Sequence, residues 1–415
     1  MKNLETLIQE LCPDGVEFRT MEEVFEIRNG YTPSKNNPDF WEGGTIPWFR
    51  MEDIRQNGRI LSDAIQHITP AAIKGKGLFR ANSIIIATTA TIGEHALVIA
   101  DSLANQRFTN LSVRKSLSAC LLPKFVFYYM FVIDEWCKKN VNAGNFASVD
   151  MKRFKKLEFP LPPIEVQTDI VRILDKFTSL EAELEAELDC RKRQYEYYRD
   201  KLLSFENMGG QDVEWKKMSE VCEIKGRIGF RGYTRNDLVS KGEGAISMSP
   251  SNIVNGVLTF DDNTYLSWEK YEESPEIMAK VGNIVFTKTG STVGKTALIK
   301  KLPQECTINP QLVLITCTDC NNRYLTHVMQ DTRFQAQVRK FAGIGSVPNI
   351  SQKALAGILV PIPSEDEQER IANILDRFES LTTSLTAGLP AEIAARRQQY
   401  EHYRDQLLTF KRKTA

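Results

Sequence analysis

A glycine- and threonine-rich segment in the second half of the chain, GSTVGKT at residues 290–296, carries the side chains most suggestive of chemistry. Its composition is that of a phosphate-binding loop, in which glycines and a lysine cradle a nucleotide between a strand and a helix. That motif needs four residues between its first glycine and the Gly-Lys pair, whereas Gly290 precedes Gly294-Lys295 by one residue too few. Pro303 also follows too soon for a long helix. A nucleotide-using enzyme therefore stays an alternative, and the same composition suits a loop that contacts DNA phosphates or base edges.

Cysteine and histidine spacing gives no catalytic or metal site. Cys317 and Cys320 form a solitary CxxC, without the second pair of ligands that a closed zinc site requires. The four histidines lie far apart in sequence, at positions 67, 95, 327 and 402. A chain of 415 residues without a strong catalytic motif is expected to bind rather than to catalyse. We expect no cofactor and no metal to be bound by this chain.

The formal net charge of zero hides an uneven distribution of charge along the chain. Residues 27–158 carry 18 basic and 11 acidic side chains, whereas residues 159–206 carry 7 basic and 11 acidic ones. A surplus of lysine and arginine on one part of a protein favours contact with the phosphates of nucleic acid. A coiled-coil assembly protein that binds no DNA, with its basic side chains merely solvated, is a further alternative.

An internal repeat organises the sequence. Residues 167–180 (QTDIVRILDKFTSL) match residues 368–381 (QERIANILDRFESL) at 8 of 14 positions, and residues 193–205 match residues 398–410 at 9 of 13. Segments 28–144 and 225–343 share little beyond TIG at 91–93 and TVG at 292–294. The ends of each half are therefore constant and the middles vary.

The constant ends have the apolar spacing of long helices. Apolar residues from Ile170 to Phe205 follow a heptad-like pattern, which predicts a rod of roughly forty residues and about 60 Å. In the second copy Gly388 and Pro390 should break the helix into two pieces. The variable middles alternate short β-like runs with helical segments at 122–139 and 323–341, an α/β pattern. These patterns predict domains at 1–158 and 207–358, with long spacer helices at 159–206 and 359–415.

Two variable regions, each closed by a Pro-x-Pro…Gln…Ile-x-x-Ile-Leu-Asp helix that ends in QYExYRDxLL(S/T)F, resemble the specificity subunit of a type I restriction-modification system. The resemblance covers nearly the whole chain, and TIG, TVG, Asn105-Gln106 and Pro310-Gln311 are similar to short shared spots of its target-recognition domains. It implies two mixed α/β target-recognition domains separated by long helices that form an antiparallel coiled coil with pseudo-two-fold symmetry. It also implies that the chain is not an enzyme.

The resemblance further implies the partners. Each domain would read one half of a split, asymmetric target in double-stranded DNA. Two modification (methyltransferase) subunits carrying S-adenosylmethionine would dock on the chain, and two restriction (motor-nuclease) subunits would join for cleavage. Eight scattered cysteines and the lack of a signal or membrane segment lead us to expect a cytoplasmic protein.

Side-chain type and position in loops indicate the candidate contacts with DNA, since arginine grips guanine or phosphate and asparagine or glutamine can pair with adenine. In the first variable region these are Arg28, Tyr31, Arg50, Arg55, Asn57, Arg59, Arg80, Thr89, Gln106 and Arg107. In the second they are Arg227, Arg231, Tyr233, Arg235, Asn252, Lys288, Ser291, Lys295 and Asn349. The helical tyrosines are expected to make core or partner contacts rather than to stack on bases: Tyr195, Tyr198, Tyr400 and Tyr403.

Overall fold

The chain forms two compact units. The computed structural model describes residues 4–142, 147–205, 213–227, 232–343, 347–383 and 388–413. One unit comprises residues 1–182 with 395–415, and the other comprises residues 183–394. The predicted boundary between residues 206 and 207 lies outside the described residues.

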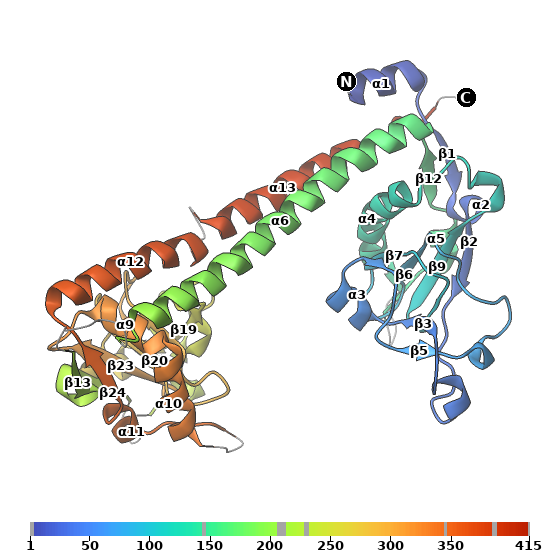
Figure 1. The fold of residues 1–415 in the computed structure, drawn as a ribbon. Coiled ribbons are helices and arrows are strands. Elements are labelled where there is room, and N and C mark those ends of the chain that lie inside the picture. Colours follow the sequence, from blue (N-terminus) through green and yellow to red (C-terminus); the bar gives the residue numbers. More distant parts are fainter. Residues whose placement is uncertain are drawn as a thin grey trace. The chain divides into compact units, whose positions relative to one another are not determined.

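The elements of each unit follow the chain (Figure 1). The first unit contains α1 (Leu4–Leu11), β1 (Glu17–Thr20), α2 (Met21–Val24), β2 (Phe25–Asn29), β3 (Ile46–Phe49), α3 (Met51–Asn57), β4 (Ile60–Leu61), β5 (His67–Ile68), β6 (Ser83–Ala87), β7 (His95–Val98), β8 (Leu103–Ala104), β9 (Phe108–Val113), α4 (Pro123–Lys139), β10 (Val141–Asn142), β11 (Ser148–Val149), α5 (Met151–Lys155) and β12 (Glu158–Leu161). The second contains β13 (Glu214–Lys217), α7 (Met218–Val221), β14 (Cys222–Lys225), β15 (Leu238–Val239), β16 (Gly244–Met248), β17 (Ile253–Val254), β18 (Val257–Leu258), β19 (Thr264–Ser267), α8 (Trp268–Glu272), β20 (Ile284–Thr287), β21 (Thr296–Leu298), β22 (Cys306–Ile308), β23 (Leu312–Cys317), α9 (Asn322–Gln330), α10 (Thr332–Ala342), α11 (Gln352–Ala356), β24 (Leu359–Ile362) and α12 (Glu365–Thr383). Helix α6 (Ile164–Leu202) and helix α13 (Leu389–Leu407) each contribute to both units.

Both units are built on a sheet with the same strand order. The order is β2-β9-β6-β7 in the first unit, where β4 adds to β7 in parallel, and β14-β23-β20-β21 in the second. A second sheet in each unit also contains one parallel pair, β3 with β8 and β16 with β22. Four strands of the main sheet therefore have the same order in both units, although the two middles share little sequence.

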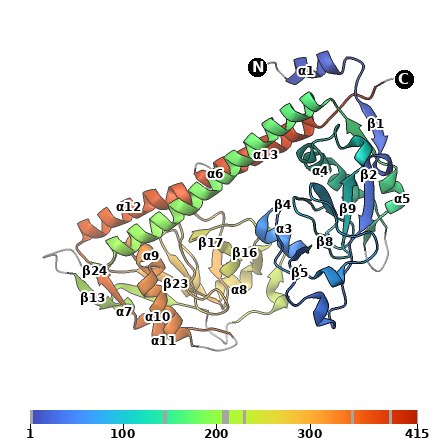
Figure 2. The same cartoon turned by 45° about the vertical axis from the view of Figure 1, so that its right-hand side comes forward.

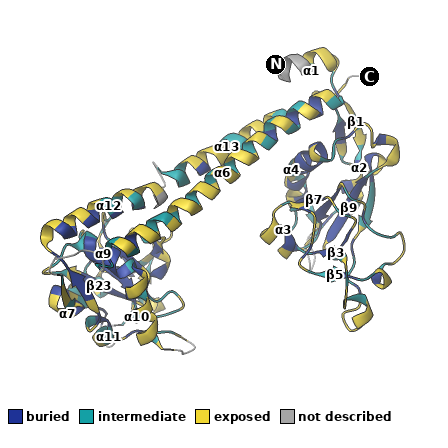
Figure 3. Cartoon of the chain, viewed as in Figure 1, coloured by how far each residue is buried: buried dark blue, intermediate teal, exposed yellow. Residues whose placement is uncertain are grey.

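The central strands are buried on both faces. In β6, Ile84 and Ile86 face one apolar cluster and Ile85 faces another, as the two-residue period of a strand requires. In β20, Ile284 and Val285 divide in the same way. Figure 3 shows this burial as dark blue along the strands of each unit. Each sheet is thus a rigid support for the loops at its edges.

A buried glutamine attaches a long helix to each unit. The Leu122 N–H, just before α4, donates to Oε1 of Gln167 at 2.9 Å, and Gln167 Nε2 donates to the Cys120 carbonyl at 2.7 Å. At the equivalent position of α12, Gln368 Oε1 accepts from the Asn321 N–H, just before α9, at 2.9 Å. Both glutamines are almost completely buried. One buried side chain of the repeat therefore ties its helix to the backbone that precedes a helix of the unit.

The same aromatic pair joins the helices in each unit. Phe177 of α6 stacks on Tyr403 of α13 with ring centroids 5.5 Å apart, and Glu181 pairs with Arg397 one turn further along. The residue numbers rise on α6 and fall on α13, so these segments are antiparallel. In the second unit Tyr198 of α6 stacks on Phe378 of α12, also at 5.5 Å. Figure 2 shows α6 beside α13 and beside α12.

One predicted helix was wrong in its extent. The pattern predicted a single helix over 323–341, but the chain forms α9 and α10 with Asp331 between them in an extended conformation. The Asp331 carboxylate accepts from the Arg333 N–H at 2.8 Å and so caps α10. The second long helical segment consists of α12, which ends at Thr383, and α13, which begins at Leu389.

Replacing Gln167 with alanine should lower the free energy of unfolding by about 1–3 kcal/mol, because the buried Pro162 carbonyl loses its donor and the Leu122 N–H and the Cys120 carbonyl lose their partners in a half-buried site. Urea unfolding followed by circular dichroism measures the change. The matched control is Gln398→Ala on the exposed surface of α13, which should change stability by less than about 0.5 kcal/mol. Equal effects of the two substitutions would contradict an anchoring role for Gln167.

Candidate nucleic-acid interface

In each unit the loop between two central strands lies against the loop before a third strand. In the first unit these are residues 88–94, between β6 and β7, and residues 105–107, before β9. The Thr88 N–H donates to the Arg107 carbonyl at 3.0 Å, and the Thr88 carbonyl accepts from the Val149 N–H at 2.9 Å. We call these two loops together the loop edge of the unit.

The loop edge of the second unit has the same hydrogen bonds. It consists of residues 288–295, between β20 and β21, and residues 309–311, before β23. The Lys288 N–H donates to the Gln311 carbonyl at 2.8 Å, and the Lys288 carbonyl accepts from the Ile350 N–H at 2.9 Å. Two regions of unlike sequence therefore present one backbone arrangement.

An asparagine fixes the second loop of each edge. Asn105 Oδ1 accepts from the Arg107 N–H at 3.0 Å, and Asn309 Oδ1 accepts from the Gln311 N–H at 3.0 Å. Such a side chain replaces the backbone partner of a turn. These bonds make Asn105 equivalent to Asn309 and Arg107 equivalent to Gln311.

The equivalence also relates the two short spots that resemble the family, Asn105-Gln106 and Pro310-Gln311. In the structure Gln106 corresponds to Pro310, and Arg107 corresponds to Gln311. Only the asparagine that precedes them, Asn105 or Asn309, has the same role in both loops.

Three of the predicted DNA contacts gather at the loop edge of the first unit. Thr89 forms an isolated β-bridge with Ser148, and Gln106 Oε1 accepts from the Thr32 hydroxyl at 2.5 Å. The Arg107 side chain is exposed and forms no ion pair with any residue in the described ranges. Its guanidinium is thus available to a ligand.

Four predicted contacts gather in the second unit: Lys288, Ser291, Lys295 and Asn349. The Thr289 hydroxyl donates to Asn349 Oδ1 at 2.6 Å, which ties residues 347–349 to the loop. Ser291 is exposed at the loop, and Lys288 is half-buried. The Gly290 N–H donates to the Pro348 carbonyl at 2.9 Å, so the segment before α11 supports the loop from one side.

Several other predicted contacts instead hold their own unit together. Arg28 donates to the carbonyls of Gly77 and Leu78 at 2.6 and 3.1 Å. The Tyr31 hydroxyl donates to the Ala72 carbonyl at 3.0 Å. These side chains organise the long connection after β5 and would have to release it to reach a duplex.

Two arginines of the first unit make contacts outside the cluster around Arg107, although Arg59 contacts His95, which directly follows residues 88–94. Arg59 donates to the His95 carbonyl at 3.2 Å, beside the aromatic surface of α4. Arg80 pairs with Glu26 at 3.2 Å, close to the end of β9 that lies opposite its loop edge. Neither arginine therefore belongs to the cluster around Arg107.

The remaining candidates of the first unit and Arg235 lie on other exposed segments. Arg50 pairs with Glu52 at 2.9 Å at the start of α3. Arg55 and Asn57 are exposed on α3, and Arg235 is exposed on a single 3₁₀ turn. Arg50 directly follows Phe49, whose carbonyl accepts from the Asn105 N–H of the loop edge at 3.1 Å. No contact among the described residues joins Arg55, Asn57 or Arg235 to a loop edge.

Arg227 is a buried structural residue. Its guanidinium donates to the Thr307 hydroxyl at 3.2 Å and lies over the Tyr233 ring, whose hydroxyl bonds to Ser247 at 2.9 Å. Burial lowers the pKa of Arg227. Neither Arg227 nor Tyr233 is available to DNA without breaking these contacts. Arg231 lies outside the described residues.

Asn252 is also buried, and its amide holds a turn. Its Oδ1 accepts from the Ser249 N–H at 2.9 Å, and its Nδ2 donates to the Thr259 carbonyl at 3.0 Å and to Asn263 Oδ1 at 3.2 Å. Only 3% of the Asn252 surface is exposed. Its side chain therefore bonds to the backbone of its own turn instead of contacting a base.

The four helical tyrosines contact the protein itself. The Tyr195 hydroxyl bonds to Nδ1 of His327 at 3.0 Å. Burial raises the pKa of Tyr195. Burial likewise raises the pKa of Tyr400 to about 12. Tyr198 and Tyr403 form the aromatic stacks described above and keep 37% and 40% of their surface exposed. Their exposed parts leave room for a partner.

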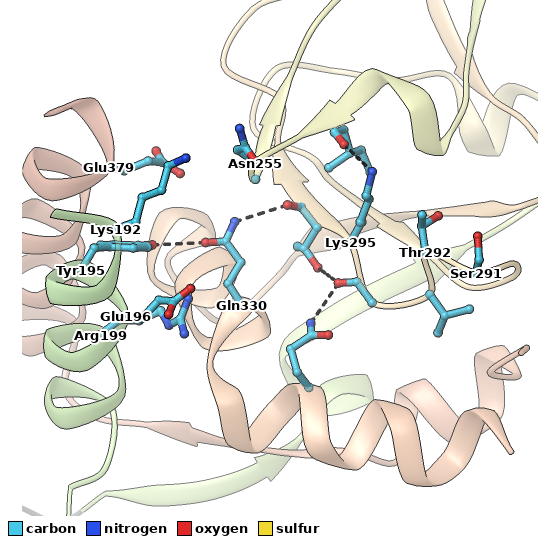
Figure 4. A pocket seen from close by; sticks show the side chains of 16 residues that line it. Lys192, Tyr195, Glu196, Arg199, Asn255, Ser291, Thr292, Lys295, Gln330 and Glu379 are labelled. Atoms are coloured by element: carbon cyan, nitrogen blue, oxygen red, sulfur yellow. Dashed lines mark hydrogen bonds between the residues drawn. The ribbon is translucent and has the colours of Figure 1, made fainter. Parts of the chain in front are cut away.

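A cleft of about 560 Å³ in the second unit runs beside the β20–β21 loop. Figure 4 shows Lys192 and Tyr195 of α6 on one wall and Ser291, Thr292 and Lys295 of the loop on the other. The loop thus has one side toward the helices and one side toward residues 309–311.

The nucleotide-binding alternative is not favoured. The loop leads from β20 into the antiparallel strand β21, so no helix begins where a phosphate would need its N-terminus. Lys295 Nζ donates to the Ile253 carbonyl at 3.0 Å, which directs the lysine toward a turn of the same unit.

Neither a metal cluster nor a membrane-spanning helix is found within the described ranges. Burial raises the pKa of the Cys317 thiol to about 11 and that of Cys320 still further, which disfavours the thiolate form that binds metal.

Gln311 and the two asparagines that fix the loops were not among the predicted DNA contacts, although Asn105-Gln106 and Pro310-Gln311 resembled short shared spots of the family. Gln311 is exposed, and a Cβ added at Gly290 would lie 3.5 Å from its Nε2, so its amide lies beside the β20–β21 loop. One sequence pattern could have identified the two asparagines: each lies three residues before the first apolar residue of a strand, Asn105 before Phe108 and Asn309 before Leu312.

Comparison with known proteins agrees with this arrangement. The family model "Type I restriction modification DNA specificity domain" matches residues 13–189 and 211–395. The EcoprrI type I restriction enzyme specificity subunit of Escherichia coli is 38% identical over 386 residues, 90% of each chain. The EcoR124I/EcoR124II specificity subunit of the same species is 33% identical, covering 72% of this chain and 74% of the relative. A solved chain described under "Structural basis underlying complex assembly and conformational transition of the type I R-M system" superposes with a TM-score of 0.60 at 17% identity, covering 95% of this chain and 97% of that one.

Two repeated α/β units with matching loop edges and long paired helices define a DNA specificity protein with an internal repeat. The chain belongs to the type I restriction-modification DNA specificity family. The predicted family, the fold class and a DNA-recognition role without catalysis are confirmed by this membership. The chain acts with DNA and with other subunits of such a system.

Replacing Asn252 with alanine should lower the free energy of unfolding by about 1–3 kcal/mol, because several backbone groups of the turn lose their partner. The sequence preference for DNA should stay unchanged, since the side chain is not exposed. Urea unfolding and selection from a randomised duplex pool measure the two quantities. Asn57→Ala on exposed α3 is the matched control, with an expected change below about 0.5 kcal/mol. A changed base preference without lost stability would contradict this role for Asn252.

Proposed function

We propose that this chain reads a two-part, asymmetric target in double-stranded DNA, one part with the loop edge of each unit. The observation that carries the proposal is one backbone arrangement that presents different side chains. Gln106 and Arg107 in the first unit stand where Pro310 and Gln311 stand in the second. The same backbone arrangement with different side chains in the two units favours recognition of two different DNA sequences, one by each unit.

The charge distribution supports contact with phosphates. The first variable region has seven more basic than acidic side chains, and Lys288 lies within the loop edge of the second unit. Nonspecific phosphate contact supplies affinity and positions the protein, whereas side chains at the loop edge supply sequence preference.

Two modification subunits would dock on the two copies of the repeated helix. Tyr197 of α6, with 61% of its surface exposed, and His402 of α13 occupy equivalent positions on outward faces. Two equivalent surfaces in one chain suit two copies of one partner. S-adenosylmethionine would be bound by these partners, and two restriction subunits would join the complex for cleavage. The complex would work in the cytoplasm.

Mapping modified adenines in the genome of a host that expresses this chain with its modification subunits tests the proposal. A split motif with two specified parts of different sequence is the expected result. Modification at unrelated sites, or at a single continuous motif, would overturn it.

Exchanging residues 28–144 for the corresponding region of a relative should change one part of the modified motif and leave the other intact. The region contains the whole loop edge of the first unit and none of the second. Exchange of residues 225–343 is the reciprocal control and should change only the other part. Changes in both parts from a single exchange would refute the division of labour.

A four-residue helical insertion after Leu184 should lengthen the unspecified gap within the motif. The site lies in the middle of α6, between the segments that carry the contacts of Phe177 and Tyr198. Four residues extend a helix by about 6 Å, which is about two base pairs of DNA. The modified motif gives the gap directly, and an unchanged gap would exclude α6 as the element that sets it.

A further inference from the structure

We propose that Arg107 and Gln311 are the equivalent base-reading residues of the two units, and that Arg107 selects guanine and Gln311 selects adenine. This inference rests on the proposed function and assigns its specificity to one position in each loop edge. It concerns the chemical class of base at one position of each part of the target.

The backbone at both positions is held from two sides. The N–H of Arg107 is bound by Asn105 and its carbonyl accepts from the Thr88 N–H at 3.0 Å. The N–H of Gln311 is bound by Asn309 and its carbonyl accepts from the Lys288 N–H at 2.8 Å. A side chain on such a fixed backbone has a defined starting point, which lowers the cost of ordering it against a base.

Both side chains are exposed, and in each unit a nearby polar side chain is engaged within the protein. Gln106 is bound by Thr32, and Thr289 is bound by Asn349. The Arg107 guanidinium is exposed and has no ion-pair partner among the residues that the structure describes. Availability on a fixed backbone thus separates Arg107 from its neighbour Gln106 in the same loop.

The Gln311 amide is exposed and already oriented. Nδ2 of Asn309 donates to Oε1 of Gln311 at 3.2 Å, which identifies the oxygen side of the amide. Nε2 lies toward Gly290, beside the turn of the β20–β21 loop. Oε1 keeps a second lone pair, and Nε2 can donate two hydrogen bonds.

The chemistry of the two side chains sets the expected bases. A guanidinium donates two parallel hydrogen bonds to O6 and N7 of guanine, and a glutamine amide donates to N7 and accepts from N6 of adenine. A fixed position occupied by arginine in one unit and glutamine in the other therefore discriminates guanine from adenine in the major groove.

The test is the pair of substitutions Arg107→Gln and Gln311→Arg, each in the full chain assembled with its modification subunits. Arg107→Gln should change the preference at one position of one part of the target from guanine to adenine. Gln311→Arg should make the reverse change in the other part. Base preference is measured by selection from a randomised duplex pool and by mapping modified adenines. The preference for the original base should fall roughly 5- to 150-fold, the range for one lost bidentate contact.

Two controls separate reading from general effects. Gln56→Arg adds the same charge on exposed α3 and should leave every base preference unchanged. Lys288→Ala should weaken binding to all sequences equally and reduce its salt dependence, as expected for a phosphate contact. Should an exchanged side chain prevent assembly, Arg107→Ala and Gln311→Ala should relax the same single positions.

The outcomes distinguish this inference from the function on which it rests. One outcome is a split target in the unsubstituted complex that stays the same in all four variants at Arg107 and Gln311. This result would overturn the assignment of these two residues and leave the proposed function standing. A complex of the unsubstituted chain with no split target would overturn the proposed function itself.

Discussion

The buried glutamine at the start of each repeated helix is the interaction on which the architecture depends. Gln167 and Gln368 satisfy backbone groups that precede α4 and α9, and those helices cover the main sheets. The glutamine amides themselves are buried, and an unpaired polar group at such a position would cost more than a typical surface contact supplies. The constant ends of the two halves are therefore an attachment that tolerates little change, and the sheet behind it fixes where the loop edge lies.

Sequence patterns predicted the helices and the repeat because both depend on local spacing. The strand order could not be predicted, since pairing joins distant segments whose side chains differ between the units. The sequence of β6 is SIIIA and that of β20 is IVFT. Both can form a central strand, because each places apolar side chains on both faces of its sheet. Asp331 interrupts the predicted helix at 323–341 because its carboxylate caps α10, a local competition that apolar spacing does not reveal.

The candidate site was predicted in part, for a similar reason. Arginine and asparagine side chains can form hydrogen bonds with DNA, but whether a given one is exposed depends on residues far away in the sequence. Arg227 meets Thr307, and Asn252 meets Thr259, so both become structural. Gln311 has the right chemistry and was missed, because its role is visible only once Asn309 is seen to fix the backbone as Asn105 does.

A fixed backbone with exposed side chains explains how one fold can serve many targets. Substitutions at exposed positions such as Arg107 and Gln311 usually change stability by less than about 0.5 kcal/mol, since they remove no buried contact. In the role that we propose for Arg107 and Gln311, the same substitutions would alter hydrogen-bond patterns worth about 1–3 kcal/mol in base discrimination. Sequence preference can therefore change while the fold is retained, provided that the asparagines, the glutamines and the sheets are kept. The proposed asymmetric target would require two such supports within one chain, each carrying its own side chains.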